Sequence, residues 1–539
     1  MFDLLIRDAL IFDGTGQPGF VGDIGIEEDK IAAMGVIPME AEAVRGIDAR
    51  GLAAAPGFID IHTHADIALL ARPEHLPKVM QGVTTEIFTN CGLGFAPVTN
   101  EGLLVQRRYI AGLFGDDGNE EAVRTRPSNG LHRQVDWKWR SVAEFLSQFE
   151  ARGIGANIAY LIPHGSVRVS VMGMEERHAD AAELRAMNAM VARGMDEGAW
   201  GMSTGIWYAP MRAAGHDELV TLCGTAGFFA THQRDYGDRI FAATEESLSI
   251  ARDAGVPVQI AHLQMNGPDN AGKAGELLSC LERARAGGVD VTCDTYPYTA
   301  GSTFIQSLLP AWAIEDGPEA IMRRLAEPGA RAKIVDAIRR DGEARSGGSG
   351  WDRYDLVGAQ SAENRGLEGL TFVAAAKARG LTVPEWVCAV LEEDELRACY
   401  VHHAAHEGNV RDILKWPGQM IGSDGLHLPG KTHPRLYGTF PRVLGHYSRD
   451  EHVLSLEQAV HKMTEMPAAR LGLKGRGKLQ VGYAADLVLF DPVAVCDTAT
   501  FDDPLRYPTG LPNVFVNGVA VKWQDKPTNA LPGRVLRRR

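Results

Sequence analysis

Short apolar runs alternate with stretches of helical character along the middle of the chain. The apolar runs, which are rich in strand-forming residues, end near residues 64, 91, 165, 208, 232, 262, 298 and 424. Segments 181–198, 239–255 and 274–288 lie between such runs and have helical character. Strands that alternate with helices favour a parallel sheet, and this series of strand ends predicts an α/β protein built on a (β/α)8 barrel.

Strand-like segments also occur at both ends of the chain. Residues 23–26 and 30–34 predict the two arms of a hairpin near the N-terminus. Near the C-terminus, residues 514–516 and 519–521 flank Asn517-Gly518, which is a favoured two-residue hairpin turn. These all-β pieces at opposite termini can pair into one sheet domain.

This pattern divides the chain into two domains and one insertion. We predict a sheet domain made of residues 1–56 and 475–539, and a barrel made of residues 57–474. Segment 300–412 is too long for a simple barrel connection, so we interpret it as a lid-like insertion between strands 7 and 8. Segment 401–414 predicts a helix, and we interpret its histidines as helical surface or lid residues: His402, His403 and His406.

Composition and charge exclude several classes of partner. The chain has 539 residues, of which 45% are hydrophobic and 23% charged, as in ordinary globular proteins. A net charge of −14, without a Lys/Arg run before the C-terminal arginines, argues against nucleic-acid and anionic-membrane binding. The seven cysteines are odd in number and widely spaced, which favours a reducing compartment. Because no signal peptide or membrane-spanning stretch is visible, we expect a cytoplasmic protein that acts on a small molecule.

Side chains that bind metals gather at the carboxyl ends of the predicted strands, where such barrels carry their chemistry. The first strand ends in His62 and His64, which a strand directs to the same side. Later strands end near Cys91, His232, His262 and Asp424. Each has an ordinary structural alternative as a buried cysteine, a core histidine or a turn aspartate. Their joint occurrence at successive strand ends favours a site with zinc-type ligands.

Several longer motifs are more specific than the single ligands. They are APGFIDIHTH at 55–64, NCG at 90–92, GMSTG at 201–205, YPYTAGST at 296–303, GSDG at 422–425 and HPRLYGTFPR at 433–442. With these motifs, nearly the whole chain resembles the amidohydrolase superfamily and, within it, the N-acyl-D-amino-acid deacylases (D-aminoacylases). The resemblance implies a metal-dependent barrel with a small β-sandwich domain built from both termini. It also implies zinc-dependent hydrolysis of a linear amide, in which an N-acyl-D-amino acid yields a carboxylate and a D-amino acid.

The resemblance further implies roles for individual residues. It implies one tight zinc site, a weaker second metal site, a general base and a subsite for the substrate carboxylate. The tight zinc site would consist of Cys91, His232 and His262, and the weaker metal site of His62, His64 and Asp424. Asp424 would also be the general base, and Arg435 with Tyr296 would bind the substrate carboxylate. A guanidinium suits the last role because its fork matches a carboxylate at two points.

The chain departs from the family pattern in two places. Many members of the superfamily bridge two metals with a carboxylated lysine at the fourth strand end, but residues 198–208 contain no lysine. Gln264 stands where the deacylases often have a lysine, so a second cation for carboxylate binding is missing. We therefore predict a preference for neutral or hydrophobic N-acyl-D-amino acids. The choice of D over L substrates rests on the resemblance alone.

Two other functions stay open at this point. One is a cyclic amide hydrolase, such as a hydantoinase or dihydroorotase. The missing fourth-strand lysine and the presence of Cys91 disfavour it. The other is a non-catalytic, metal-free interaction protein on the same fold, which the joint retention of Cys91, His232, His262 and Asp424 disfavours.

Overall fold

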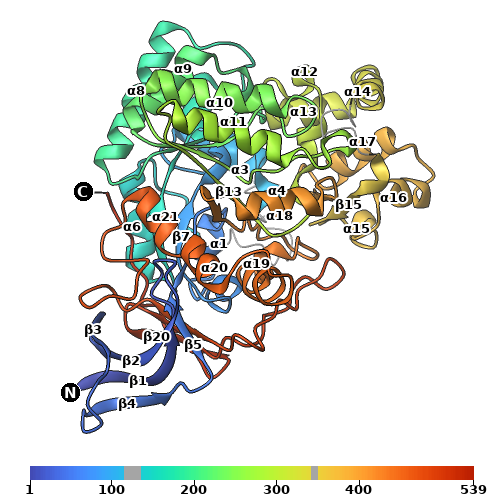
Figure 1. Cartoon of the computed structure of the whole chain (residues 1–539). Coiled ribbons are helices and arrows are strands. Elements are labelled where there is room, and N and C mark those ends of the chain that lie inside the picture. The colour runs from blue at the N-terminus through green and yellow to red at the C-terminus, as the bar shows by residue number, and fades with distance from the viewer. Residues whose placement is uncertain (115–134, 342–349, 539) are drawn as a thin grey trace.

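The middle of the chain folds as a parallel barrel in the computed structural model, which describes residues 1–114, 135–341 and 350–538 (Figure 1). The barrel strands form a three-stranded sheet and a six-stranded sheet. In spatial order these are β6 (Phe58–Asp60), β7 (Val83–Phe88) and β8 (Asn157–Tyr160), then β9 (Ile162–Pro163), β10 (Met202–Gly205), β11 (Phe229–His232), β12 (Val258–Ile260), β13 (Val291–Thr295) and β17 (Gln419–Ile421). Every pairing within the two sheets is parallel. The predicted α/β barrel is confirmed.

Backbone hydrogen bonds join the two sheets at both seams. At the first seam β8 leads directly into β9, and Trp200 N, just before β10, donates to the carbonyl oxygen of Tyr160 in β8 at 2.8 Å. At the second seam Asp424 N, just beyond β17, donates to the carbonyl oxygen of His62 at 2.8 Å. The second seam therefore places His62 and Asp424 side by side, although they come from the first and last barrel strands.

Helices cover the outside of the barrel. The predicted segments 181–198, 239–255 and 274–288 are confirmed as α8 (Ala181–Asp196), α10 (Ile240–Ala254) and α11 (Ala274–Ala286). α8 begins after Asp180, whose side chain accepts hydrogen bonds from the first-turn N–H groups of the helix. α10 ends at Gly255, which adopts a left-handed φ of 67°. Among the described residues, no helix has both the length and the apolar character needed to cross a membrane.

The two ends of the chain form one nine-stranded sheet, which lies at the lower left in Figure 1. β5 (Ala53–Pro56) and β18 (Leu487–Phe490) pair antiparallel and so join the N-terminal strands to the C-terminal ones. The predicted hairpins are confirmed as β2 (Phe20–Glu27) with β3 (Lys30–Gly35), and β19 (Asn513–Val516) with β20 (Val519–Trp523). The domain limits at residues 56/57 and 474/475 stay a prediction.

The last residues of the chain return from this sheet to the barrel. Ile158 N in β8 donates to Arg534 O at 2.9 Å, and Leu536 N donates to Ile158 O at 2.7 Å. The indole N–H of Trp200 donates to Leu536 O at 2.6 Å. The C-terminal segment thus occupies the edge of β8 that β7 does not cover.

The inserted segment builds a small sheet of its own on the right of the barrel in Figure 1. Its antiparallel strands are, in spatial order, β14 (Gly301–Phe304), β16 (Cys399–His402) and β15 (Tyr354–Val357). The prediction of a helix over 401–414 is wrong for its first half, because a helix, α18 (Glu407–Lys415), begins only at Glu407. Strand pairing on both sides of β16 decides the conformation there. Residues 342–349 of the insertion lie outside the described residues.

Candidate metal centre and active site

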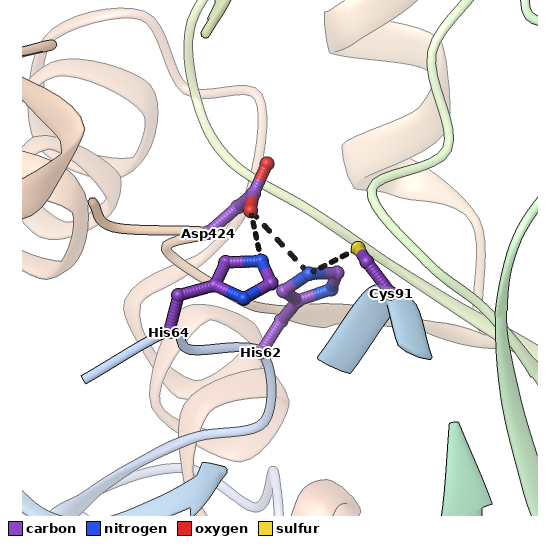
Figure 2. A group of neighbouring side chains, drawn as sticks. All are labelled: His62, His64, Cys91 and Asp424. Atoms are coloured by element: carbon purple, nitrogen blue, oxygen red, sulfur yellow. Dashed lines mark hydrogen bonds and ion pairs between the residues drawn. The ribbon is translucent and has the colours of Figure 1, made fainter. Parts of the chain in front are cut away.

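The carboxyl ends of the barrel strands bring the predicted ligands into one place. Among the described residues, two groups have ligand atoms that all lie within 4.8 Å of one another. The first is His62, His64, Cys91 and Asp424 (Figure 2), and the second is Cys91, His232 and His262. Cys91 belongs to both groups, whereas the sequence analysis placed it in the tight site alone.

The second group has donor atoms of the kind, and close to the spacing, that a zinc ion takes. Sγ of Cys91 lies 3.4 Å from Nε2 of His262, which lies 2.9 Å from Nδ1 of His232. The donors of a tetrahedral zinc ion lie roughly 3.3–3.6 Å apart, because Zn–N bonds are about 2.0–2.1 Å and Zn–S bonds about 2.3 Å. The Cys91–His262 distance falls in this range, whereas the two imidazole nitrogens lie closer together than zinc would hold them. All three side chains are buried. The donor set therefore fits a zinc ion with a fourth coordination position left open for a reactant.

The first group is centred on His62. Figure 2 shows its Nε2 atom between the thiol of Cys91, at 3.3 Å, and Oδ1 of Asp424, at 3.4 Å. Nε2 of His64 lies 3.1 Å from the same carboxylate oxygen. This arrangement gathers one sulfur, two nitrogens and one oxygen, which suits a second metal position next to the first.

A further carboxylate, Asp294 in β13, orients the ligands from outside the cluster. Its Oδ1 lies 2.9 Å from Nδ1 of His62 and accepts a hydrogen bond of 2.7 Å from the backbone N–H of His262. Holding Nδ1 leaves Nε2 of His62 for a metal, as is common for ligating histidines. The sequence analysis gave Asp294 no role, although an acid inside a buried strand is a signal for one.

The backbone is strained where it presents these side chains. Cys91, His262 and Asp424 have positive φ angles of 57°, 32° and 50°. Residues other than glycine rarely adopt such angles, and they do so mostly at functional sites where the surrounding structure holds them. The fold therefore fixes three of the candidate ligands in conformations that the isolated chain would avoid.

Burial and neighbouring charges set the protonation of the site. Burial lowers the pKa of His262 to about 4 and that of His232 well below its usual value, so both imidazoles are neutral and able to bind a metal. Burial raises the pKa of the Cys91 thiol to about 11. Burial opposes ionisation of Asp424, but Arg435 and His62 outweigh it and hold the pKa of this carboxyl well below its usual range.

Arg435 contacts the predicted base directly. Its Nη1 lies 2.9 Å from Oδ2 of Asp424, and the arginine side chain is fully buried. Its guanidinium also lies over the ring of Tyr296, 4.5 Å from the ring centroid. Arg435 begins α19 (Arg435–Arg442), whose fixed position aims the side chain at the carboxyl end of β17. Both predicted carboxylate-binding residues therefore lie beside Asp424.

A cavity of about 100 Å³ opens beside the two ligand groups. Gln264 and Tyr296 line it, and so do residues from the inserted segment: Gly301, Ser302, Thr303, Tyr400 and His402. In the described part of the chain, no lysine or arginine lines this cavity. His402 lies in strand β16, is buried and stacks on Tyr354 at 4.1 Å, so it is not a helical surface residue. Its other interpretation, as a lid residue, stays a prediction.

Comparisons with known proteins place the chain in one family and find similar solved structures. A family model described as "Amidohydrolase family" matches residues 45–522. D-aminoacylase of Alcaligenes xylosoxydans xylosoxydans is 37% identical in sequence to this chain, and the matched region spans 100% of this chain and 98% of the relative. A crystal structure of D-aminoacylase is similar with a TM-score of 0.81 at 34% identity, covering 100% of both chains. N-acyl-D-glutamate deacylase from Bordetella bronchiseptica, solved with zinc and a phosphonate mimic of the tetrahedral intermediate, is similar with a TM-score of 0.80 at 31% identity, also over 100% of both chains.

Proposed function

Because the chain belongs to the amidohydrolase family, we propose that it is a zinc-dependent N-acyl-D-amino-acid deacylase. The observation that carries the proposal is the group formed by Cys91, His232 and His262 beside the carboxylate of Asp424, next to a cavity. The full-length similarity to D-aminoacylase supports the substrate class. Zinc is the metal of choice because cysteine and histidine are donors that it takes and because the Bordetella relative is complexed with it.

The protein side chains in this proposal bind, orient and move a proton. Zinc, when bound, would supply Lewis-acid chemistry by activating water and polarising the amide carbonyl. Asp424 is the general base: it takes a proton from the attacking water and passes it to the nitrogen of the leaving amine. Oδ2 of Asp424 is held by Arg435 at 2.9 Å, whereas Oδ1 faces His62 and His64. The guanidinium therefore occupies Oδ2, which leaves Oδ1 to carry the proton when the second metal position is empty.

The site supports a substrate with one carboxylate and a neutral side chain. Tyr296 lines the cavity, and Arg435, which does not line it, lies over the Tyr296 ring and beside the base. These two residues would bind the α-carboxylate at this wall. Gln264 lines the cavity and donates to Tyr298 O at 3.4 Å, and its neutral amide adds no charge to the wall. A second carboxylate, such as that of a D-glutamate side chain, would be buried in this cavity without a cation, which is costly.

Two further parts of the proposal concern the cellular compartment of the protein, and its partners and alternative function. We place the protein in the cytoplasm, with support from its seven cysteines, all of which are free thiols. We expect small amides and no nucleic acid as partners. A cyclic amide hydrolase would be the next function to test, since the barrel and metal group suit both kinds of amide.

The test is amine release from paired N-acetyl-D- and N-acetyl-L-amino acids by the zinc-loaded protein, with leucine, methionine, phenylalanine and glutamate side chains. We expect turnover of the D forms alone, with leucine preferred over glutamate. Gln264→Lys should raise the relative rate for N-acetyl-D-glutamate, and Gln17→Lys, which adds the same charge at an exposed loop, should not. Turnover of L forms, or a clear preference for D-glutamate in the wild type, would contradict the proposal. Inactivity towards both enantiomers would favour cyclic amides.

A further inference from the structure

The cysteine ligand sits on an unusually tight turn between β7 and the next segment. Thr89, Cys91 and Gly92 all have left-handed φ angles, of 63°, 57° and 67°. Threonine is β-branched, and such a residue is a genuine outlier at a positive φ. A turn of this kind persists only where its surroundings hold it in place. Residues 89–92 form this turn, which we call the Cys91 turn.

One buried hydroxyl closes both ends of the Cys91 turn. Oγ of Ser203 donates to the carbonyl oxygen of Thr89 and accepts a hydrogen bond of 3.0 Å from the backbone N–H of Gly92. Ser203 lies in β10 and is fully buried. The hydroxyl therefore satisfies one acceptor and one donor of a strained backbone that water cannot reach.

A glycine two residues later in β10 provides the space for the turn. A Cβ atom built on Gly205 would overlap the carbonyl oxygen of Cys91. A Cβ atom on Gly92 would in turn lie 2.9 Å from the backbone nitrogen of Gly205, closer than real side chains approach. The backbone of the Cys91 turn thus fills the position that a side chain at the end of the fourth barrel strand would need. Any residue larger than glycine at position 205 would therefore displace the Cys91 turn.

We propose that Ser203 and Gly205 are positioning residues that seat the Cys91 turn on β10 and thereby place the Cys91 sulfur in the metal site. This assigns a task to the GMSTG motif, which neither the ligand set nor the cavity uses. The inference rests on the proposed function only in taking zinc as the metal. Neither residue lines the cavity, and both contact the Cys91 turn, so both act through Cys91.

The first experiment replaces Ser203 by alanine and measures metal binding without activity. We expect Ser203→Ala to bind zinc 10- to 100-fold more weakly in a chelator competition, as is common when a group that orients a ligand is removed. In the cobalt-substituted protein, the sulfur-to-cobalt charge-transfer band should weaken or shift. The matched control is Ser247→Ala, which removes an equally buried hydroxyl that donates to Ala243 O at 3.0 Å inside α10. It should leave both readouts unchanged.

Gly205→Ala is the second variant, since its Cβ would push on the Cys91 carbonyl. It should weaken zinc binding at least as much as Ser203→Ala. Its control is Gly224→Ala in α9 (His216–Ala226), where an added Cβ meets its nearest atom at 3.8 Å. Zinc affinity within threefold of the wild type with an unchanged cobalt band, in either Ser203→Ala or Gly205→Ala, would overturn the inference. A lower thermal midpoint with unchanged metal readouts would show a merely structural role and overturn it as well.

A metal-free readout separates this inference from the proposed function. In the structure Cys91 is nearly inaccessible, with 2% of its surface exposed. A released turn should expose it, so we expect at least tenfold faster alkylation of Cys91 in Ser203→Ala, measured by peptide mass spectrometry. Equal alkylation rates in the variant and the wild type would refute the seating role. Failure of the wild type to bind zinc would refute the proposed function and leave the alkylation test intact.

Discussion

Replacing Lys78 by methionine should destabilise the protein by about 3–5 kcal/mol, because the change leaves buried carboxylates without their cation. Lys78 lies in α2 (Leu76–Val79) and is fully buried. Its Nζ is 2.5 Å from Oδ2 of Asp60 and 3.5 Å from Oε1 of Glu86, and it also donates to the hydroxyl of Ser423. The lysine thus joins strands β6 and β7 to the residue that precedes Asp424.

The magnitude follows from these distances. At an effective dielectric constant of about 20, ion pairs of this length are worth roughly 5–7 kcal/mol each before the cost of desolvation. Glu86 keeps His75 as a partner, so the loss falls mainly on Asp60. Breaking a buried pair on one side typically costs about 3–5 kcal/mol, because the remaining charge stays in the interior. Asp60 also accepts hydrogen bonds from the backbone N–H groups of Ser423, at 2.8 Å, and His62, at 3.3 Å.

The assay is urea unfolding of the metal-free protein, followed by far-ultraviolet circular dichroism. The control is Lys138→Met, which removes a lysine whose side chain is 85% exposed and pairs with Asp136 at 2.9 Å. It should cost less than about 1 kcal/mol. The double variant Lys78→Met/Asp60→Asn should recover much of the loss, because it removes the unpaired charge and keeps the Oδ1 acceptor. A loss below about 1 kcal/mol for Lys78→Met, or a double variant no more stable than the single one, would refute the reasoning.

Three other predictions concern the base, a buried lysine and the C-terminal segment. Asp424→Asn should retain zinc in the Cys91 group and lower kcat by about 10²–10⁴-fold in amine-release assays; near wild-type turnover would remove Asp424 from the mechanism. Burial lowers the pKa of Lys462 to about 8, so between about pH 8 and 10.5 the unfolded chain binds the proton and the folded chain does not. Wild-type stability should therefore rise by about 3 kcal/mol across that window relative to Lys462→Met, and a constant difference between the two in urea titrations would contradict this. Ending the chain at Ala530 removes the partners of the Ile158 backbone and of the Trp200 indole, so the thermal midpoint should fall by several degrees; an unchanged midpoint would show that the segment is dispensable.

Local sequence patterns were sufficient for the barrel helices and hairpins that the sequence analysis specified. The helical segment 274–288 became α11, and the strand ends at His232 and Asp424 fell at the carboxyl end of the barrel. These features depend on residue spacing within a single element, which the chain carries locally. The helix predicted over 401–414 was wrong in its first half because the conformation of β16 depends on β14 and β15, its partners from distant parts of the insertion. Pairing of that kind overrides local preference.

The sequence by itself determined which side chains are available for chemistry: a cysteine, several histidines and an aspartate at strand ends, with Gln264 in place of a cation. Only the tertiary structure decided how they act together. It placed Cys91 in both ligand groups, set Asp294 behind His62 and brought Arg435 onto Asp424. His62 and Asp294 are 232 positions apart in the sequence and lie in or just beyond strands of different sheets. Arg435 reaches Asp424 from helix α19. These contacts depend on how separate elements pack together. The physical reason is that the spacing of residues within one helix or strand sets the direction in which a side chain points. Only packing between elements fixes the distance from that side chain to side chains on other elements.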